Sequence, residues 1–143
     1  MTTLETSDPG TTRTGHVSVA AHVATGGSLL AALVHYVAMR GHLDEWWLSA
    51  AFFSALALFQ LVWAVLVHTG DERPMLLSGL AVNAGVIALW AVTRTAGLPF
   101  GPEAGEAEAI GVPDVLSAVA EAAVVVAVLA MLLGRRKKTE PDA

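Results

Sequence analysis

The sequence contains no cysteine among its 143 residues. Disulfides, thiolate zinc sites, iron–sulfur clusters and palmitoyl anchors are therefore excluded. Charge is also scarce, because Asp, Glu, Lys and Arg make up 15% of the residues, whereas about 25% is usual in a soluble domain. No basic patch with interleaved aromatic residues is present, so nucleic acid is not an expected partner. The length of the chain indicates a single domain. The scarcity of charge indicates that this domain folds in apolar surroundings.

Four long stretches of the sequence are almost free of charge. The stretches 17–39, 46–68 and 74–93 contain no Asp, Glu, Lys or Arg, and 115–134 contains only Glu121. Each stretch has the roughly 20 apolar residues that a helix needs to cross a bilayer. Strands of a membrane barrel would be about half as long. The sequence therefore predicts an all-α fold, a four-helix transmembrane bundle.

The two short connections between the predicted helices are typical of turns. The segments 40–45 and 69–74 are polar, as expected between antiparallel neighbours. Gly70 is placed to end the second helix and Pro74 to begin the third. Asp44 is a candidate cap for the second helix.

The remaining segments complete the domain organisation. The connection 94–113 is rich in Gly, Pro and Glu, which do not continue a helix. Residues 1–16 lack an apolar period and are predicted to form a disordered cytoplasmic tail. Residues 135–143 form a predicted basic cytoplasmic tail, which leaves 17–134 as the transmembrane domain.

Basic residues are divided unequally between the two sides of the predicted bundle. With four spans both termini lie on one side, which then carries six cations: Arg13, Arg73 and the run 135–138. The other side carries Arg40 and Arg94, several acidic residues, and three tryptophans at the place of an interfacial aromatic belt: Trp46, Trp47 and Trp90. Because cytoplasmic loops retain Lys and Arg, we expect both termini in the cytoplasm, an N-in/C-in arrangement in a bacterial plasma membrane.

Each predicted helix carries a polar side chain inside the span. Such groups are costly in lipid and usually face the bundle interior. From the helical rise, Gln60 and Asn83 lie roughly 15–20 Å below the outer boundary, Glu121 about 9 Å and His35 about 6 Å. We therefore expect two layers that form an outward-facing, mostly acidic site for a cation, a proton or a small ligand. The candidate site residues are His35, Gln60, Asn83, Arg94 and Glu121.

Structural roles compete with this hypothesis. Asn83 and Gln60 are typical of interhelical hydrogen bonds worth ~1 kcal/mol each, and Asp114 is a candidate N-cap of the last helix. Glu121 is harder to explain, because a charged carboxylate deep in a span costs ~2.5–3.5 kcal/mol. A salt bridge with Arg94 is its best structural explanation. We also expect Glu121 to approach His35, the ionisable group at similar depth.

A metal-handling or redox membrane protein is the alternative function. Its copper or zinc ligands would be imidazoles and carboxylates, namely His35, His42, Glu45 and Glu121. A b-type haem between His22 and His68 is conceivable in a four-helix bundle, but isolated histidines at helix ends are common. The leading expectation is that no cofactor is bound.

One run of the sequence is distinctive. Residues 94–102 read Arg-Thr-x-Gly-x-Pro-x-Gly-Pro and follow the segment 83–90. Together with further matches at His35, His42, Glu45-Trp46, Phe52-Phe53, Gln60, Val112-Pro113-Asp114 and Glu121, this run resembles small four-span integral membrane proteins of high-GC Gram-positive bacteria. The resemblance covers residues 35–121 and implies a membrane location, but no chemistry, since that group has no assigned activity.

The sequence shows no nucleophile–base pair of a hydrolase, so we expect a non-enzymatic protein. Its surroundings are the lipid bilayer. A homo-oligomer or a larger membrane complex, in which the protein would be a helper subunit, is left open as the partner.

Overall fold

The computed structural model of the protein describes residues 18–139. The predicted tail 1–16 and the end of the predicted basic tail lie outside the described residues. Residues 18–139 form four α-helices and no strand. The prediction of an all-α four-helix bundle is confirmed.

The helices are α1 (Val19–Gly41), α2 (Trp47–Thr69), α3 (Arg73–Thr95) and α4 (Val112–Thr139). The first three agree with the predicted spans to within two residues at each end. The fourth begins three residues earlier than predicted and continues through the basic run. Pro113 permits the earlier start, because a residue in the first turn of a helix needs no partner for its N–H.

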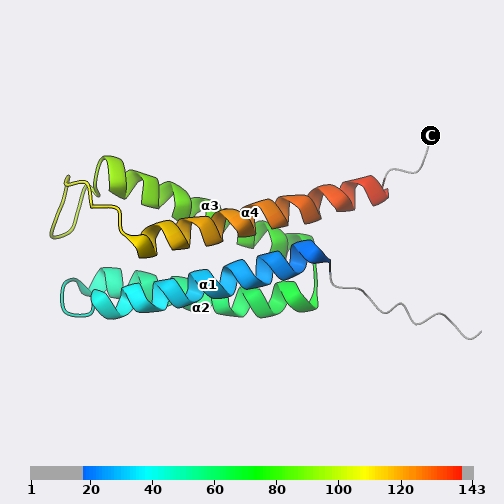
Figure 1. Ribbon diagram of the computed structural model, residues 1–143, viewed down its shortest axis with the longest axis horizontal. Helices are drawn as coiled ribbons and strands as arrows, with labels where there is room; N and C mark the ends of the chain where they lie inside the picture. The colour runs from blue at the N-terminus through cyan, green and yellow to red at the C-terminus, as the bar shows by residue number, and fades with distance from the viewer. Residues whose placement is uncertain (1–17, 140–143) are drawn as a thin grey trace, which may run out of the picture.

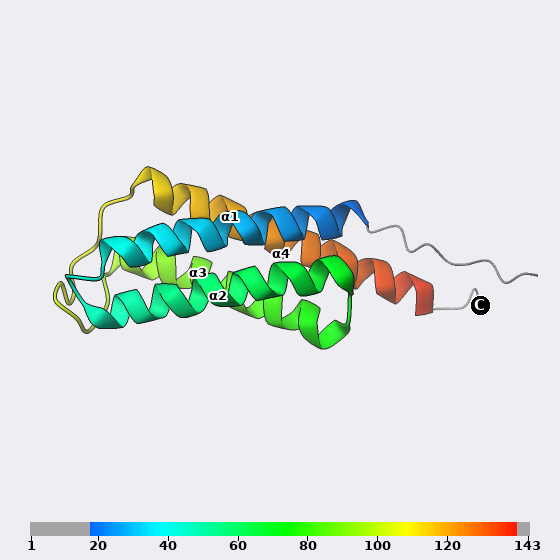
Figure 2. The same cartoon turned by 90° about the horizontal axis from the view of Figure 1, so that it is seen from below.

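The helices are arranged so that α1 packs on both α2 and α4, and α4 packs on both α1 and α3 (Figure 1, Figure 2). Although they follow each other in sequence, α2 and α3 touch only sparsely. The α1–α2 turn and the α3–α4 connection share one end of the bundle, and the α2–α3 turn lies at the other (Figure 1). We name these the outer end and the inner end, after the sides on which the charge distribution predicts them.

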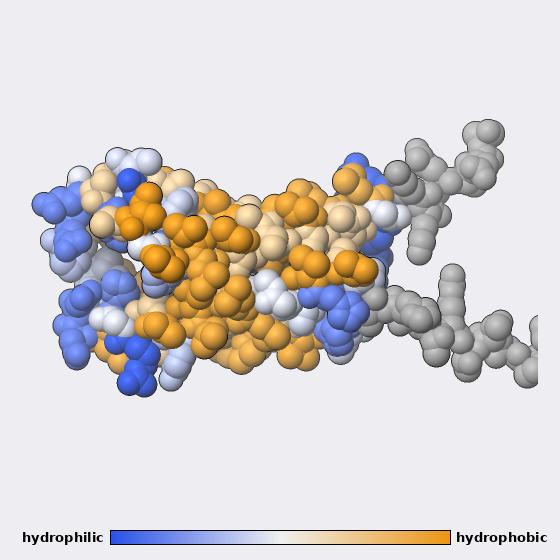
Figure 3. All heavy atoms as spheres, in the orientation of Figure 1, coloured by the Kyte–Doolittle hydropathy of each residue, from blue (hydrophilic) through white to orange (hydrophobic). Residues whose placement is uncertain are grey.

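The middle of the bundle is covered by apolar side chains. On the face shown in Figure 3, hydrophobic residues surround the middle and hydrophilic residues gather at both ends. Leu33, Leu58 and Val126 are 59%, 62% and 67% exposed. All four helices are long and apolar enough to cross a membrane, and a bilayer solvates such side chains whereas water does not. The architecture is that of a multi-pass membrane protein.

Close packing concentrates near the inner end, where all four helices contribute to one core. Its buried members are Ala24, Trp63, Val67, Leu76, Val124, Ala127 and Val128. The absent side chain of Gly79 allows the Trp63 ring to lie against the α3 backbone, and Trp63 Nε1 donates to the Met75 carbonyl at 2.9 Å. Gly27 also allows a close approach of α1 to α4, because a Cβ there would lie 2.9 Å from the Ala120 carbonyl oxygen.

Of the predictions for the ends of α2 and α3, two are confirmed and one is wrong. Gly70 is the C-cap of α2, and Pro74 lies in the first turn of α3. The prediction that Asp44 caps α2 is wrong, because the N-cap is Trp46 and no side chain caps it. The preceding residues form a hydrogen-bonded turn in which the Trp46 N–H donates to the His42 carbonyl at 3.3 Å. This turn places Asp44 too early to reach the first N–H groups of α2.

Candidate functional site

A partly open cavity of 420 Å³ lies between the four helices in the outer half of the bundle. Much of its wall is apolar and includes five aromatic rings, those of Trp46, Phe52, Phe53, Trp90 and Phe100. Polar side chains line it at two levels. The floor consists of His35, Ser117 and Glu121, and the mouth consists of His42, Glu108 and Asp114. Seven residues of α4 separate Asp114 from Glu121, so the floor lies about 10 Å below the mouth.

Glu121 lies at the centre of the floor and is 1% exposed. Its Oε1 atom is 3.4 Å from His35 Nε2. The same oxygen accepts hydrogen bonds from Ser117 Oγ at 3.4 Å and from Gln60 Nε2 at 3.5 Å. The expected approach of Glu121 to His35 is confirmed. Partners from α1, α2 and α4 itself therefore surround the carboxyl group, which makes its depth in the span tolerable.

Below the floor, a second set of polar contacts ties the helices together. Gln60 Nε2 donates to Asn83 Oδ1 at 3.4 Å, and Asn83 Nδ2 donates to the Gly79 carbonyl at 2.8 Å. Ser28 Oγ donates to the Gln60 carbonyl at 2.8 Å. Within residues 18–139, Gln60 Oε1 has no hydrogen-bond partner. These contacts connect α1, α2 and α3 as interhelical hydrogen bonds do.

The two layers expected from the sequence are joined into one network. Because α4 starts at Val112, Glu121 lies about 13 Å from the outer end of its helix rather than about 9 Å. Because α1 continues to Gly41, His35 lies about 9 Å down rather than about 6 Å. The deeper positions bring both groups within reach of the Gln60 side chain.

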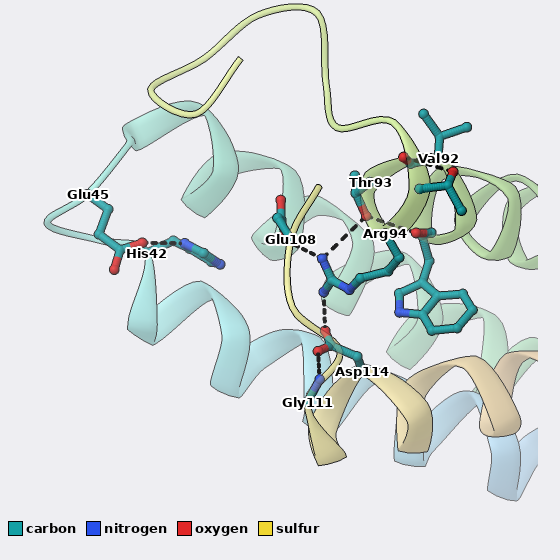
Figure 4. A network of polar contacts seen from close by, with 10 residues as sticks. His42, Glu45, Val92, Thr93, Arg94, Glu108, Gly111 and Asp114 are labelled. Atoms are coloured by element: carbon teal, nitrogen blue, oxygen red, sulfur yellow. Dashed lines mark hydrogen bonds and ion pairs between the residues drawn. The ribbon is translucent and has the colours of Figure 1, made fainter. Parts of the chain in front are cut away.

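The predicted salt bridge between Arg94 and Glu121 is wrong. Arg94 Nη1 pairs with Glu108, and Arg94 Nη2 lies 2.6 Å from Asp114 Oδ1 (Figure 4). Arg94 lies in the last turn of α3, level with the start of α4, and the connection folds back so that the Glu108 N–H donates to the Thr93 carbonyl at 2.9 Å. Of the candidate site residues, Arg94 alone lies at the outer level, and the structure brings together His35, Gln60, Asn83 and Glu121.

Asp114 is not the N-cap that the sequence predicts. It lies in the first turn of α4, where its Oδ2 accepts from the Gly111 N–H at 2.7 Å (Figure 4). This contact is the carboxylate half of a capping box, and the positive end of the helix dipole favours it. Its other oxygen binds Arg94. The Asp114 carboxylate thus stabilises the N-terminus of α4 and links α4 to α3.

The four residues of the alternative metal site form two separate pairs. His42 Nδ1 lies 2.8 Å from Glu45 Oε2 at the outer surface, whereas His35 and Glu121 meet at the floor. The Phe53 ring contacts both histidines, with centroid distances of 5.4 Å to His42 and 5.7 Å to His35. In the part of the chain that the structure describes, no group of three or more His, Asp or Glu side chains is placed to hold a metal ion.

The histidines of the haem alternative touch each other. The rings of His22 and His68 meet edge to face, with centroids 5.6 Å apart. Two axial ligands must face one iron from opposite sides of the macrocycle. Rings in direct contact do not have that arrangement.

The aromatic wall of the cavity is what sequence reasoning missed. Trp46 and Trp90 were expected at the lipid interface, yet both line the cavity, and only Trp47 has the exposure of a belt residue, at 73%. Phe100 enters from the α3–α4 connection, where Gly101 adopts a φ of +105° next to the Trp46 ring. The sequence does place these aromatic residues near the outer ends of the spans. It does not show whether their rings point into the bundle or toward the lipid.

Comparisons with known proteins identify no relative. No family model, curated protein or solved structure matches the chain. The resemblance to small four-span proteins therefore stays a prediction, and the function has to be argued from the cavity itself.

Proposed function

We propose that this protein is a non-enzymatic protein of the bacterial plasma membrane that binds a small, largely apolar ligand from the outer side. The observation that carries the proposal is the 420 Å³ cavity with its aromatic wall and with Glu121 at its floor. Apolar concave sites with a few convergent polar groups are the usual form of small-ligand sites. An ionisable side chain inside a span marks a functional site by default.

The distribution of charge supports an outward opening. The inner end carries Arg73 and the basic run 135–138, and such residues are retained in the cytoplasm. At the outer end, the guanidinium of Arg94 is neutralised by Glu108 and Asp114. With this orientation both termini are cytoplasmic, and the mouth of the cavity faces the outside of the cell.

The order of polar contacts at the floor supports binding rather than catalysis. A serine nucleophile needs a base next to its hydroxyl group, usually an imidazole. Ser117 Oγ donates instead to Glu121 Oε1, and His35 Nε2 approaches that same oxygen rather than the hydroxyl group. The hydroxyl group is thereby held as a hydrogen-bond donor at the floor.

A thiol-labelling experiment tests the proposal. Because the sequence contains no native cysteine, only the introduced thiol can react. Ala118 lines the cavity, whereas its neighbour Val119 faces outward and is 61% exposed. In intact cells, Ala118→Cys should react with a membrane-impermeant thiol reagent at least about tenfold faster than Val119→Cys, because a thiolate forms only where water enters. Indole, added as a neutral aromatic probe, should slow the labelling of Ala118→Cys.

The labelling pattern also reports the orientation. Ala104→Cys in the α3–α4 connection should be labelled in intact cells, and Thr139→Cys at the end of α4 should require permeabilised cells. The reverse pattern would place the mouth in the cytoplasm. Labelling of Ala118→Cys that indole does not slow would contradict a ligand-binding cavity.

A further inference from the structure

The protons on the His35–Glu121 pair can be counted from its contacts. His35 Nδ1 lies 2.7 Å from the Ala31 carbonyl oxygen, and a carbonyl only accepts, so Nδ1 carries a hydrogen. The other nitrogen, Nε2, faces Glu121 Oε1 at 3.4 Å. Without a proton between them, two lone pairs would face each other. One proton is therefore shared, bound either to the carboxyl oxygen or to the imidazole nitrogen, and in both cases the pair has no net charge.

The charged groups around this pair leave the cavity with an excess of negative charge. At the mouth, one cation, Arg94, contacts two carboxylates, Glu108 and Asp114. Nearby, His42 is paired with Glu45. The three carboxylates outnumber the cations in these pairs, which leaves a negative charge that attracts cations and repels anions.

The remaining groups that face the pair are neutral. α2 presents Gln60 and Ser49, α3 presents Asn83 below Arg94, and α4 adds Ser117 beside Glu121. No second cation within residues 18–139 has an ion pair with Glu121. When the shared proton leaves, the floor therefore becomes negative and no protein group replaces the lost charge.

The wall of the cavity suits an organic cation better than an inorganic one. It includes five aromatic rings, and the face of an aromatic ring attracts ammonium groups within about 6 Å of the ring centroid. A divalent metal ion would need several ligating oxygens or nitrogens, and the described residues offer no such group. An ammonium ion with apolar substituents matches the negative charge, the aromatic rings and the apolar wall together.

We infer that the cavity takes a monovalent organic ammonium cation and that its binding releases the proton shared by His35 and Glu121. The inference rests on the proposed ligand site and names the class of its ligand. The cation enters with one positive charge, the O–H or N–H bond of the pair breaks, and water carries the proton away. Glu121 then stays as a carboxylate beside a neutral His35, so the total charge of the occupied cavity equals that of the empty one.

The test uses the full-length protein in detergent and two probes of the same shape. Benzyltrimethylammonium is the cation, and neopentylbenzene is its uncharged analogue, in which carbon replaces nitrogen. Calorimetry in buffers of different ionisation enthalpy should count close to one proton released per bound cation and none for the analogue. The cation should bind about tenfold more weakly for each unit by which the pH falls while the pair holds its proton, as one-proton linkage requires. The affinity of the analogue should not change.

A variant and a matched control locate the proton. Glu121→Gln should release no proton and should bind the cation at least about tenfold more weakly, because the carboxylate that balances the ligand is gone. Glu103→Gln, which changes an exposed carboxylate in the α3–α4 connection, should behave as the parent protein does. Full proton release from Glu121→Gln would overturn the inference.

The outcomes separate this inference from the proposed function. If both probes bind equally and no proton is released, the inference is wrong and the ligand site stands. The same holds if the cation does not bind while indole still protects Ala118→Cys. If neither probe binds and indole gives no protection, the proposed function fails together with the inference. The parent protein decides each case, so the result does not depend on how well a variant folds.

Discussion

At the inner end of the bundle the four helices meet in an apolar core, whereas at the outer end they enclose a cavity. The inner end is held by Trp63 against Gly79 and by the ion pair of Arg135 Nη1 with Asp71 Oδ2 at 2.9 Å. The outer end is held by the pairing of Arg94 with two carboxylates and by the folded connection. The difference teaches that one well-packed end can position the helices while the other end encloses a cavity.

The largest expected effect contrasts a leucine of the core with a leucine of the cavity wall. Leu76 is fully buried in the inner core, and Leu89 lines the cavity on the same helix. Leu76→Ala should lower the free energy of unfolding by about 3 kcal/mol, because it leaves a void that the neighbouring helices cannot fill. Leu89→Ala enlarges an existing space and should cost less than about 1 kcal/mol. Unfolding in mixed micelles with rising denaturing detergent measures both, and equal losses would break the comparison.

The second effect is smaller and contrasts two glycines of α3. Gly79→Ala places a methyl group inside the Trp63 ring, and we expect a loss of about 1–3 kcal/mol from overpacking. Gly85→Ala is the matched control, since no atom lies within 4 Å of a Cβ built there. It should leave the free energy of unfolding unchanged or slightly raised. A similar loss of unfolding free energy in both variants would mean that α3 packs tightly against its neighbours along its whole length and not only in its inner half.

The sequence predicted the helices because their signal is local. Long runs without charge, with Gly70 and Pro74 at a turn, are visible residue by residue. It could not tell which glycines face a neighbouring helix: Gly27 and Gly79 do, whereas Gly26 and Gly85 have open space around them. Facing depends on the rotation of each helix in the bundle, and a nearly uniform apolar surface carries little information about rotation.

The candidate site was predictable in most of its members but in only one of its contacts. A buried carboxyl group needs polar partners, and the similar depth of His35 predicted its contact with Glu121. The partner of Arg94 was missed because Glu108 belongs to a connection whose path is set by glycines at positive φ, such as Gly97 and Gly101. An outward-facing site was expected, but its apolar, aromatic wall was missed, because the direction in which each ring faces depends on the rotation of the helices in the bundle.

The smallest expected effect concerns Glu121, which lies where the packed half meets the open half. In Glu121→Gln the amide oxygen, in the place of Oε1, can still accept from Ser117 and Gln60. We therefore expect a change in the free energy of unfolding within about 0.6 kcal/mol, the size of an average interhelical hydrogen bond. Glu121→Ala is the contrasting variant, because it leaves these polar neighbours without an acceptor and should cost about 1–3 kcal/mol. The two variants, unfolded side by side at neutral pH, distinguish hydrogen bonding from charge. If Glu121→Gln lost as much as Glu121→Ala, the network would depend on an ion pair at its centre, and the outer half would be held by buried charge and not left free for a ligand.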